Sequence, residues 1–363
     1  MKSIFELLST NLTSGQFESL KSHYSNKKII VTGGASFIGS NLVDILTKFN
    51  AEVIVIDDLS SGRQDNLNTS PSCKFIQGDL RNLAFARETI AKSDVLFHLA
   101  AIHGGRGFIE TFKRDMLANL ALDNNVFSSA AINGVKMVVH ASSACAYPVN
   151  LQENEISRNL LAESQASMED PGLAFADGVY GWTKLIGEYQ LANHCSVNGM
   201  RGRSARIFTA YGERENESHA AIALIAKALL KADPYPIWGN GEQTRNFTHV
   251  ADTVLGLLFL GHDDSELIFD VFNVGTSSHI KVIDFVNEIF KQIEWNPGSI
   301  NFQLDKPTGV ASRASDNKKM LSRFGWEPKI DIPTGLSRTI HWYKSIKDRP
   351  LSLGELEKKL SSR

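Results

Sequence analysis

The sequence predicts an α/β fold in which a doubly wound parallel sheet is joined to a smaller α+β lobe. Two observations lead to this prediction. Between residues 28 and 205, short apolar runs alternate with segments of helical periodicity, which is the pattern of successive strand–helix–strand units. Beyond residue 212 this alternation loosens, and helices separated by short strands predominate.

The first half of the chain supplies the predicted strands and helices of the sheet in a regular order. Strands are expected at 28–32, 51–57, 73–77, 94–100, 135–142 and 203–208. Helices are expected at 37–49, about 82–92, 110–132 and 178–198, and the polar stretch 151–177 is predicted to be irregular. In the second half, helices are expected near 219–231, 249–261, 282–293 and 316–324.

These elements predict two main domains and two terminal segments. Residues 28–205 form the sheet domain, to which a segment near 247–275 returns, and residues 206–346 form most of the smaller lobe. Residues 1–27 are predicted to be a short amphipathic helix plus a linker that packs on a neighbouring lobe or partner. Residues 347–363 are predicted to be a polar tail.

Composition excludes several classes of function. The net charge of −2, from 38 basic and 40 acidic residues, provides no overall attraction to nucleic acid or membranes. The cysteines at 73, 145 and 195 are few and irregularly spaced, which favours a reducing compartment, and no CxxC or HExxH motif predicts a metal site. Without a signal-like start or an apolar run longer than 254–261, the protein is expected to be cytoplasmic.

A glycine-rich loop, VTGGASFIGS at 31–40, joins the first strand to the first helix. Gly33 and Gly39 lie where a turn can bring a pyrophosphate close to the free N–H groups of the helix, although Ser36 replaces the middle glycine. Asp57 ends the second strand and can accept bonds from ribose hydroxyls, which favours NAD over NADP. Asp58 is the competing acid, and a plain turn beginning with two acids is the alternative. Together, the loop and the acid predict a Rossmann-like dinucleotide site.

The stretch YGWTK places Tyr180 and Lys184 four residues apart, on one face of a helix. A nearby ammonium favours the phenolate form of a tyrosine, so Tyr180 can accept a proton from a substrate hydroxyl as hydride leaves its carbon. Ser143, at the end of the preceding strand, can hold the same oxygen. A YxxxK motif also occurs by chance in many helices, and its value here lies in following the glycine loop.

The motifs VTGGASFIGS, VIDDLSSG, LFHLAA, SSACAYP, YGWTK and WGNGEQTRNFTHVAD resemble those of a known family over residues 28–346. It is the nucleotide-sugar epimerase/dehydratase family of extended short-chain dehydrogenases/reductases, whose members oxidise a sugar transiently at C4 with NAD. The resemblance implies that Asp79 and Leu80 flank the adenine. The full predicted NAD-binding set is Gly33, Ser36, Phe37, Ile38, Gly39, Asp57, Asp58, Ser61, Gly62, Asp79, Leu80, Leu99, Ala100, Ala101, Tyr180 and Lys184.

Within this family, the loop SSACAYP resembles that of GDP-mannose 3,5-epimerases and GDP-fucose synthases. There the cysteine that matches Cys145 moves a proton at the carbon next to the ketone, and HLAAIHGGRGFIE strengthens the likeness to the first group. Ala144 and Cys145 replace the Asp-Glu pair of the dehydratases, which argues against dehydration. His219 resembles the histidine of the GDP-fucose synthases, whereas the 3,5-epimerases have a lysine in this region. A packing cysteine and a helix-terminal histidine are the alternatives.

The resemblance also implies a diphosphate clamp. Arg245 and Arg313 match family positions that bind the nucleotide diphosphate, and guanidinium groups suit phosphate oxygens. A surface ion pair is the alternative for either arginine, and a solvated loop charge for Arg106. The predicted substrate-binding set is Gly105, Arg106, Ser143, Trp238, Gln243, Arg245 and Arg313.

The sequence therefore predicts an NAD-dependent nucleotide-sugar epimerase in which Ser143, Tyr180 and Lys184 act at C4 while Cys145 and His219 move protons at C3 or C5. A GDP-sugar substrate is favoured by analogy. Alternatives are a UDP-sugar C4-epimerase, a 4-keto nucleotide-sugar reductase and a nucleotide-sensing regulatory protein. By resemblance, we expect a homodimer through helices 110–132 and 178–198.

Overall fold

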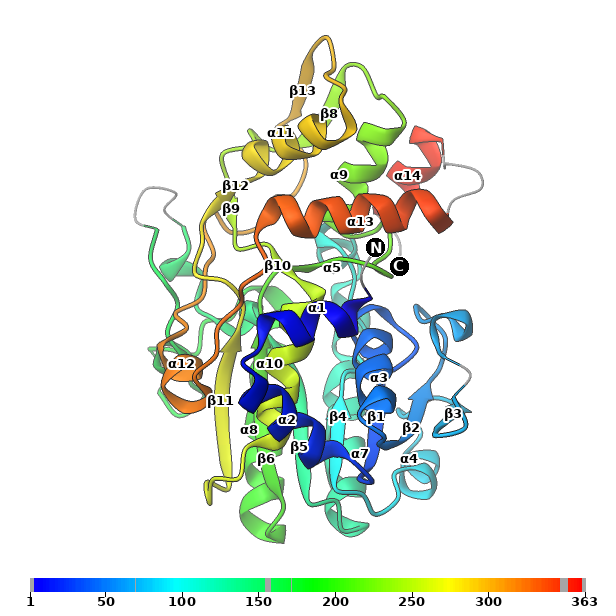
Figure 1. The fold of residues 1–363 in the computed structure, drawn as a ribbon. Helices are drawn as coiled ribbons and strands as arrows, with labels where there is room; N and C mark the ends of the chain where they lie inside the picture. The colour runs from blue at the N-terminus through cyan, green and yellow to red at the C-terminus, as the bar shows by residue number, and fades with distance from the viewer. Residues whose placement is uncertain (1–2, 69, 154–157, 171, 347–351, 361–363) are drawn as a thin grey trace.

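A seven-stranded parallel sheet forms the larger part of the molecule (Figure 1), in a computed structural model that describes residues 3–68, 70–153, 158–170, 172–346 and 352–360. The strand order is β11-β6-β5-β4-β1-β2-β3. Their bounds are Lys28–Thr32 (β1), Glu52–Asp57 (β2), Cys73–Gln77 (β3), Val95–His98 (β4), Met137–Ser143 (β5), Arg201–Ile207 (β6) and Phe269–Val274 (β11). The order reverses between β1 and β4, and such a switch point opens a ligand crevice at the carboxyl edge of a sheet.

Helices cover both faces of this sheet, which explains why β1 and β2 are almost continuous runs of Val and Ile. One face packs against α3 (Phe37–Lys48) and α10 (Val250–His262). The other packs against α4 (Leu83–Thr89), α7 (Ala118–Ile132) and α8 (Gly178–Asn198). The predicted doubly wound α/β fold is confirmed.

The smaller lobe lies beyond the carboxyl ends of the central strands (Figure 1). Its core joins α9 (Ala220–Leu229), α11 (Val282–Ile293) and α13 (Ile332–Ile346). The remaining strands are β7 (Ala210–Tyr211), β8 (Tyr235–Trp238), β9 (Thr244–Arg245), β10 (Thr248–His249), β12 (Ile280–Lys281) and β13 (Ile300–Gln303), and α12 spans Lys318–Phe324. Within the described ranges, no helix is both long and apolar enough to span a bilayer.

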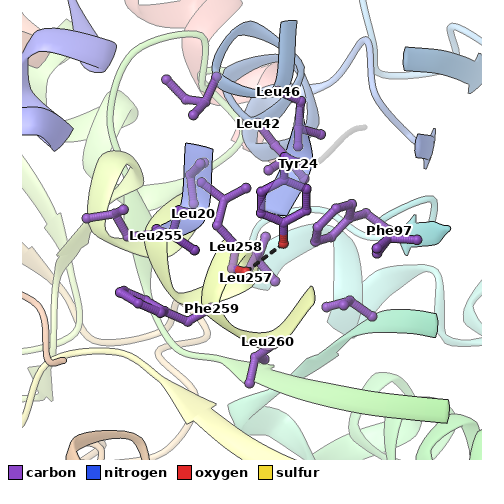
Figure 2. Close-up of a cluster of buried hydrophobic side chains, with 14 of the residues drawn as sticks. Leu20, Tyr24, Leu42, Leu46, Phe97, Leu255, Leu257, Leu258, Phe259 and Leu260 are labelled. Atoms are coloured by element: carbon purple, nitrogen blue, oxygen red, sulfur yellow. Dashed lines mark hydrogen bonds between the residues drawn. The ribbon is translucent and has the colours of Figure 1, made fainter. Parts of the chain in front are cut away.

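The N-terminal segment forms two helices, α1 (Ile4–Asn11) and α2 (Ser14–Tyr24), where the sequence predicted one helix and a linker. Thr13 separates them because its side chain accepts a hydrogen bond from the Gln16 N–H and so starts a second helix. Figure 2 shows Leu20 and Tyr24 packed among apolar side chains of α3 and α10, with the Tyr24 hydroxyl donating to the carbonyl of Leu258 at 2.6 Å. The segment is therefore part of the main core.

Two other segments differ from the sequence prediction. The single helix expected at 110–132 is instead α5 (Arg106–Thr111), α6 (Lys113–Met116) and α7. The chain bends at Phe112 (φ −104°, ψ 44°), and the bend lets Phe108 and Met116 form one small apolar cluster. The expected polar tail contains α14 (Leu353–Leu360), whose buried Leu356 and Leu360 face α9 and α5; residues 347–351 and 361–363 lie outside the described part.

Candidate active site

The glycine-rich loop fits closely against its neighbours. Gly33 has a φ of +68°, and a Cβ at this position would lie 2.7 Å from the backbone N of Ala100. A Cβ on Gly39 would lie 2.3 Å from the carbonyl oxygen of Gly33, so the loop and the first turn of α3 require both glycines. Ser36 is the N-cap residue of α3, but its side chain forms no capping hydrogen bond. The first N–H groups of the helix thus remain open to an anion.

Asp57 is fixed at the carboxyl end of β2. Its carboxylate accepts hydrogen bonds from the backbone N–H groups of Ala35 (3.0 Å) and Leu59 (2.8 Å). Burial raises the pKa of Asp57, and these hydrogen bonds oppose the increase. Gly62 leaves the space beside this carboxylate, because a Cβ there would lie 2.9 Å from both oxygens. Asp58 instead accepts bonds from the backbone N–H and hydroxyl of Ser60 in its own turn.

Two connected cavities run along the carboxyl edge from Asp57 to Tyr180 and form what we call the cleft. The part near β2 is lined by Gly33, Ser36, Asp57, Asp58, Ser61, Asp79, Leu80, Leu99, Ala100 and Ala101, among others. The second part shares Gly33, Ser36, Leu99 and Ala101 and adds Phe37, Ile38, Gly39, Ser143, Tyr180, Lys184 and His219. The glycine cradle, the open helix N-terminus and the buried acid at its far end fit an extended dinucleotide.

Tyr180 and Lys184 reach the cleft from the first turns of α8, as their spacing predicts. The Lys184 ammonium lies 5.8 Å from the centre of the Tyr180 ring. Lys184 as a whole is 2% exposed. Burial raises the pKa of the Tyr180 phenol and lowers that of Lys184. Ser143 lies at the end of β5, where its hydroxyl accepts a hydrogen bond from the Cys145 N–H at 3.1 Å.

A further cavity, which we call the arginine pocket, adjoins the cleft at Arg106, Thr209 and Ala220, which line both. It contains most of the predicted substrate residues and lies between the sheet and the smaller lobe. Its lining includes Cys145, Asp177, Lys227, Trp238, Gln243, Arg245, Arg313 and Leu360. Four of its lining side chains are cationic and one is a carboxylate, so the pocket suits an anionic ligand.

Asp177 binds two of the arginines of the arginine pocket, Arg106 and Arg313. One of its oxygens accepts a hydrogen bond from Arg313 at 2.9 Å, and its carboxylate also accepts two from Arg106 at 3.0 and 3.2 Å. Arg313 in turn donates to the sulfur of Cys145 at 3.3 Å. Arg245 is held by the carbonyl of Thr308 at 2.7 Å, and burial lowers its pKa to about 9, which leaves it charged at neutral pH.

Cys145 is fixed relative to Tyr180 because its loop packs directly on α8. The carbonyl of Cys145 accepts a hydrogen bond from the Asp177 N–H at 2.8 Å. A Cβ on Gly181 would lie 2.1 Å from the same carbonyl oxygen, so only glycine allows this approach next to Tyr180. Cys145 lines the arginine pocket, where its sulfur lies 3.3 Å from Arg313, and its backbone lies beside the start of the helix that carries the tyrosine.

His219 stands at the N-terminus of α9 and lines the cleft. Its Nδ1 lies 3.0 Å from a carboxylate oxygen of Glu215, a residue that is 4% exposed. Because that carboxylate occupies one ring nitrogen, Nε2 is the nitrogen that remains for proton exchange. The ring of His103 lies beside that of His219, with 5.4 Å between ring centres.

The structure thus brings the predicted residues into the cleft and the adjoining arginine pocket. Every predicted cofactor residue except Gly62 lines the cleft, and Gly105, Arg106 and Ser143 line it as well. Cys145, Trp238, Gln243, Arg245 and Arg313 line the arginine pocket, in which Arg106 also takes part. No group of three or more potential metal-binding side chains occurs in the described ranges.

Sequence reasoning missed several charged residues of these cavities, among them Asp177, Glu215 and Lys227. Asp177 directly precedes α8, where an aspartate usually caps the helix, but its side chain binds arginines instead. Glu215 lies four residues before His219, a spacing that could have identified the pair. Lys227 is buried on α9 among apolar side chains, and burial lowers its pKa to about 8. No sequence signal distinguished it.

Most of the chain is similar to known proteins. A family model described as the NAD dependent epimerase/dehydratase family matches residues 29–275. GDP-mannose 3,5-epimerase of Arabidopsis thaliana is 30% identical over 326 residues, which are 88% of this chain and 82% of that protein. A crystal structure of a UDP-galactose 4-epimerase is 27% identical with a TM-score of 0.73, and covers 88% of this chain and 99% of its own. A structure of MoeE5 in complex with UDP-glucuronic acid and NAD has the same identity and coverages, with a TM-score of 0.75.

Proposed function

Because the chain belongs to the NAD dependent epimerase/dehydratase family, we propose that it is an epimerase of a nucleotide-diphosphate sugar. The reaction proceeds through a transient 4-ketone, and protons exchange at C3, C5 or both. A GDP-sugar is favoured because a GDP-mannose 3,5-epimerase is among the relatives and because the Cys145 loop has the matching residues.

The first task of the protein is to remove the proton of the C4 hydroxyl. Tyr180 is the proton acceptor, and Ser143 holds the same oxygen. Burial alone disfavours the phenolate, so the charged Lys184 beside the ring is needed to stabilise it. NAD, when bound in the cleft, supplies the acceptor for the hydride that leaves C4.

The second task is to move protons at the carbons next to the ketone, whose C–H bonds it acidifies. Cys145 is one proton carrier, and the Arg313 guanidinium at 3.3 Å stabilises negative charge on its sulfur. His219 is the other, through its Nε2, with Glu215 holding the ring. After exchange the ketone is reduced again, so turnover consumes no cofactor.

The arginine pocket binds the diphosphate. Arg106, Arg245 and Arg313 are three guanidinium groups, and Asp177 is the single carboxylate in the lining. A diphosphate would compensate the remaining positive charge. The observation that supports the proposal is that the cleft, lined by Tyr180, adjoins the arginine pocket, lined by Cys145 and the arginines, at Arg106.

Incubation with GDP-mannose and other nucleotide sugars in deuterium oxide, followed by NMR and mass spectrometry, tests the proposal. We expect deuterium at C3 or C5 of the sugar. Cys145→Ser should suppress this exchange while C4 oxidation stays measurable, and Cys73→Ser, at a half-buried cysteine on β3, is the matched control. Inversion at C4 without deuterium would identify a C4-epimerase instead, and stoichiometric NADH consumption a reductase.

A further inference from the structure

Three ionisable side chains lie in the interior of the sheet domain, below the cleft. His98 is on β4, His140 is on the adjacent strand β5, and Asp123 comes from α7, which covers them. All three side chains are 0% exposed. Burial of three ionisable groups is costly unless they are paired, and the proposed reaction gives none of them a task.

A chain of hydrogen bonds leads from the wall of the cleft to Asp123. The N–H of Ala100 donates to the hydroxyl oxygen of Thr32 at 3.3 Å, and this hydroxyl lies 2.7 Å from Nδ1 of His98. Nε2 of His98 lies 3.0 Å from Oδ1 of Asp123. Because an ionised carboxylate can only accept, Nε2 of His98 donates to Asp123. One oxygen of Asp123 is thereby fixed.

The other oxygen of Asp123 is not hydrogen-bonded by any side chain or backbone group of the described residues. Nε2 of His140 lies 3.7 Å from it, too far for a hydrogen bond, and has no hydrogen-bond partner among these residues, while Nδ1 of His140 lies 3.2 Å from the Ser204 hydroxyl. Gly187 of α8 makes room for this oxygen, since a Cβ there would lie 2.6 Å from it.

Lys184 precedes Gly187 by three residues on the same face of α8. Burial lowers the pKa of Lys184, and the carboxylates of Asp123 and then Glu188 oppose the decrease. Both carboxylate oxygens of Glu188 already accept hydrogen bonds from Arg206, at 2.9 and 2.7 Å. Asp123 is therefore the carboxylate that has an oxygen without a hydrogen bond beside α8, at Gly187, one turn from Lys184.

We propose that Asp123 is a positioning residue, whose buried carboxylate, beside α8 at Gly187, keeps Lys184 charged next to Tyr180, and that His98 and His140 hold this carboxylate. The inference rests on the proposed function, in which Lys184 acts on Tyr180. The ionisable groups that the structure links directly to Lys184 are Asp123 (α7), His140 (β5), Tyr180 and Glu188 (α8). His98 (β4) binds Asp123, Arg206 (β6) binds Glu188, and Cys145 (the turn after β5) acts on Tyr180.

The negative charge of Asp123 determines in which direction the pKa values of Tyr180 and Lys184 should change when it is removed. Burial raises the pKa of Tyr180, and the charges of Cys145 and Asp123 raise it further, whereas Asp123 also supports the protonated form of Lys184. Replacing the carboxylate by an amide should therefore lower both pKa values. The whole pH profile of turnover should shift toward lower pH in Asp123→Asn.

The protonation of Lys184 can be measured without turnover. Trace acetylation of the full-length protein at a series of pH values, with peptide mass spectrometry, gives the midpoint at which the Lys184 amine becomes reactive. We expect this midpoint to fall by about one pH unit in Asp123→Asn, a roughly tenfold change in proton affinity. Asp263→Asn is the matched control, because it removes another buried carboxylate, one that binds Arg203 and Arg323 and does not act on Lys184.

An unchanged Lys184 midpoint in Asp123→Asn, or an equal shift in Asp263→Asn, would overturn the inference. If Asp123→Asn does not fold, Asp123→Ser provides the same comparison, since it retains a hydroxyl for His98 and removes the charge. The labelling result does not depend on which sugar is turned over. Failure to convert any nucleotide sugar would contradict the proposed function, and an unshifted midpoint with normal turnover would contradict only the role of Asp123.

Discussion

Arg313 takes part in both diphosphate binding and proton transfer in the proposed reaction, because it lines the arginine pocket and contacts Cys145. Its guanidinium contacts the sulfur of Cys145, the carboxylate of Asp177 and, at 2.6 Å, the amide oxygen of Gln152. The side chain is almost fully buried, so its position is fixed before any ligand binds. Such preorganisation lowers the entropy cost of binding a diphosphate.

Arg313→Gln should therefore weaken the binding of GDP to the arginine pocket. The loss of a buried, charge-assisted contact costs roughly 2–5 kcal/mol, so we expect Kd to rise by at least about tenfold in isothermal titration calorimetry. Arg323→Gln is the control, because Arg323 binds Asp263 outside the arginine pocket. An unchanged Kd in Arg313→Gln would remove Arg313 from the diphosphate site.

At the scale of elements, the N-terminal helices α1 and α2 extend the core of the sheet domain. Leu20 of α2 is 0% exposed, and Gly261 of α10 leaves the space for the Tyr24 hydroxyl, since a Cβ there would lie 2.5 Å from it. The packing in Figure 2 involves residues separated by more than 200 positions along the chain. These helices therefore contribute to stability without reaching the cleft.

Leu20→Ala should reduce the free energy of unfolding by about 2–5 kcal/mol, because it leaves a cavity between α2 and the core. Equilibrium unfolding in urea measures this loss. Leu267→Ala, at a side chain that is 52% exposed, should change stability by less than about 0.5 kcal/mol. Equal effects of the two substitutions would show that α2 does not pack as described.

Glu213 follows β7, and its carboxylate binds His249 before α10 at 3.1 Å and Arg338 of α13 at 2.7 Å. It therefore links these three elements. Burial would raise the pKa of Glu213, but the hydrogen bond from His249 and the charges of His249 and Arg338 lower it to about 2. A lowered carboxyl pKa contributes stability above the unfolded value of 4.5, and this contribution is lost as pH falls through about 2.

Glu213→Gln should accordingly cost about 3 kcal/mol of unfolding free energy near pH 7. The difference from the native protein should shrink by roughly half or more at pH 3, because the native carboxylate then loses most of its advantage. Urea unfolding of both proteins at the two pH values provides the test. A difference that does not depend on pH would show that Glu213 acts through packing alone.

Some elements could be predicted from the sequence because their signals are local. The helix expected at 178–198 coincides with α8, which ends at Gly199 in a left-handed conformation (φ +66°). The break at Phe112 could not be predicted, because it depends on how Phe108 and Met116 pack together. Local periodicity reports which residues favour a helix and carries no information on where tertiary contacts bend the chain.

At the scale of the whole molecule, the candidate site combines residues that a local sequence pattern identifies with residues that only the fold brings together. Tyr180 and Lys184 were predictable from their spacing on one helix. The contacts of Asp177 were not, since Arg106 and Arg313 lie 71 and 136 residues away in the sequence. Only the folded arrangement of the two lobes shows that a single carboxylate organises both arginines.

The outer surface of α8 carries apolar side chains that suit the expected homodimer. Trp182, Tyr189 and Val197 recur along this helix and are 36%, 48% and 82% exposed. Tyr189→Asp should place a charge in the expected interface and convert the dimer to a monomer in sedimentation velocity. Leu304→Asp, at a side chain that is 74% exposed outside α7 and α8, should leave the mass unchanged. A native protein that sediments as a monomer would contradict the expectation.

The central claim is that Tyr180 moves the proton of a sugar hydroxyl beside a dinucleotide. The most direct measurement compares native protein and Tyr180→Phe, first for bound NAD(H) by mass spectrometry and then for turnover of a nucleotide sugar. We predict that the variant retains NAD(H) and loses turnover by about 100-fold to 10,000-fold, because only the phenolic oxygen is missing. Turnover at the native rate in Tyr180→Phe would contradict the account.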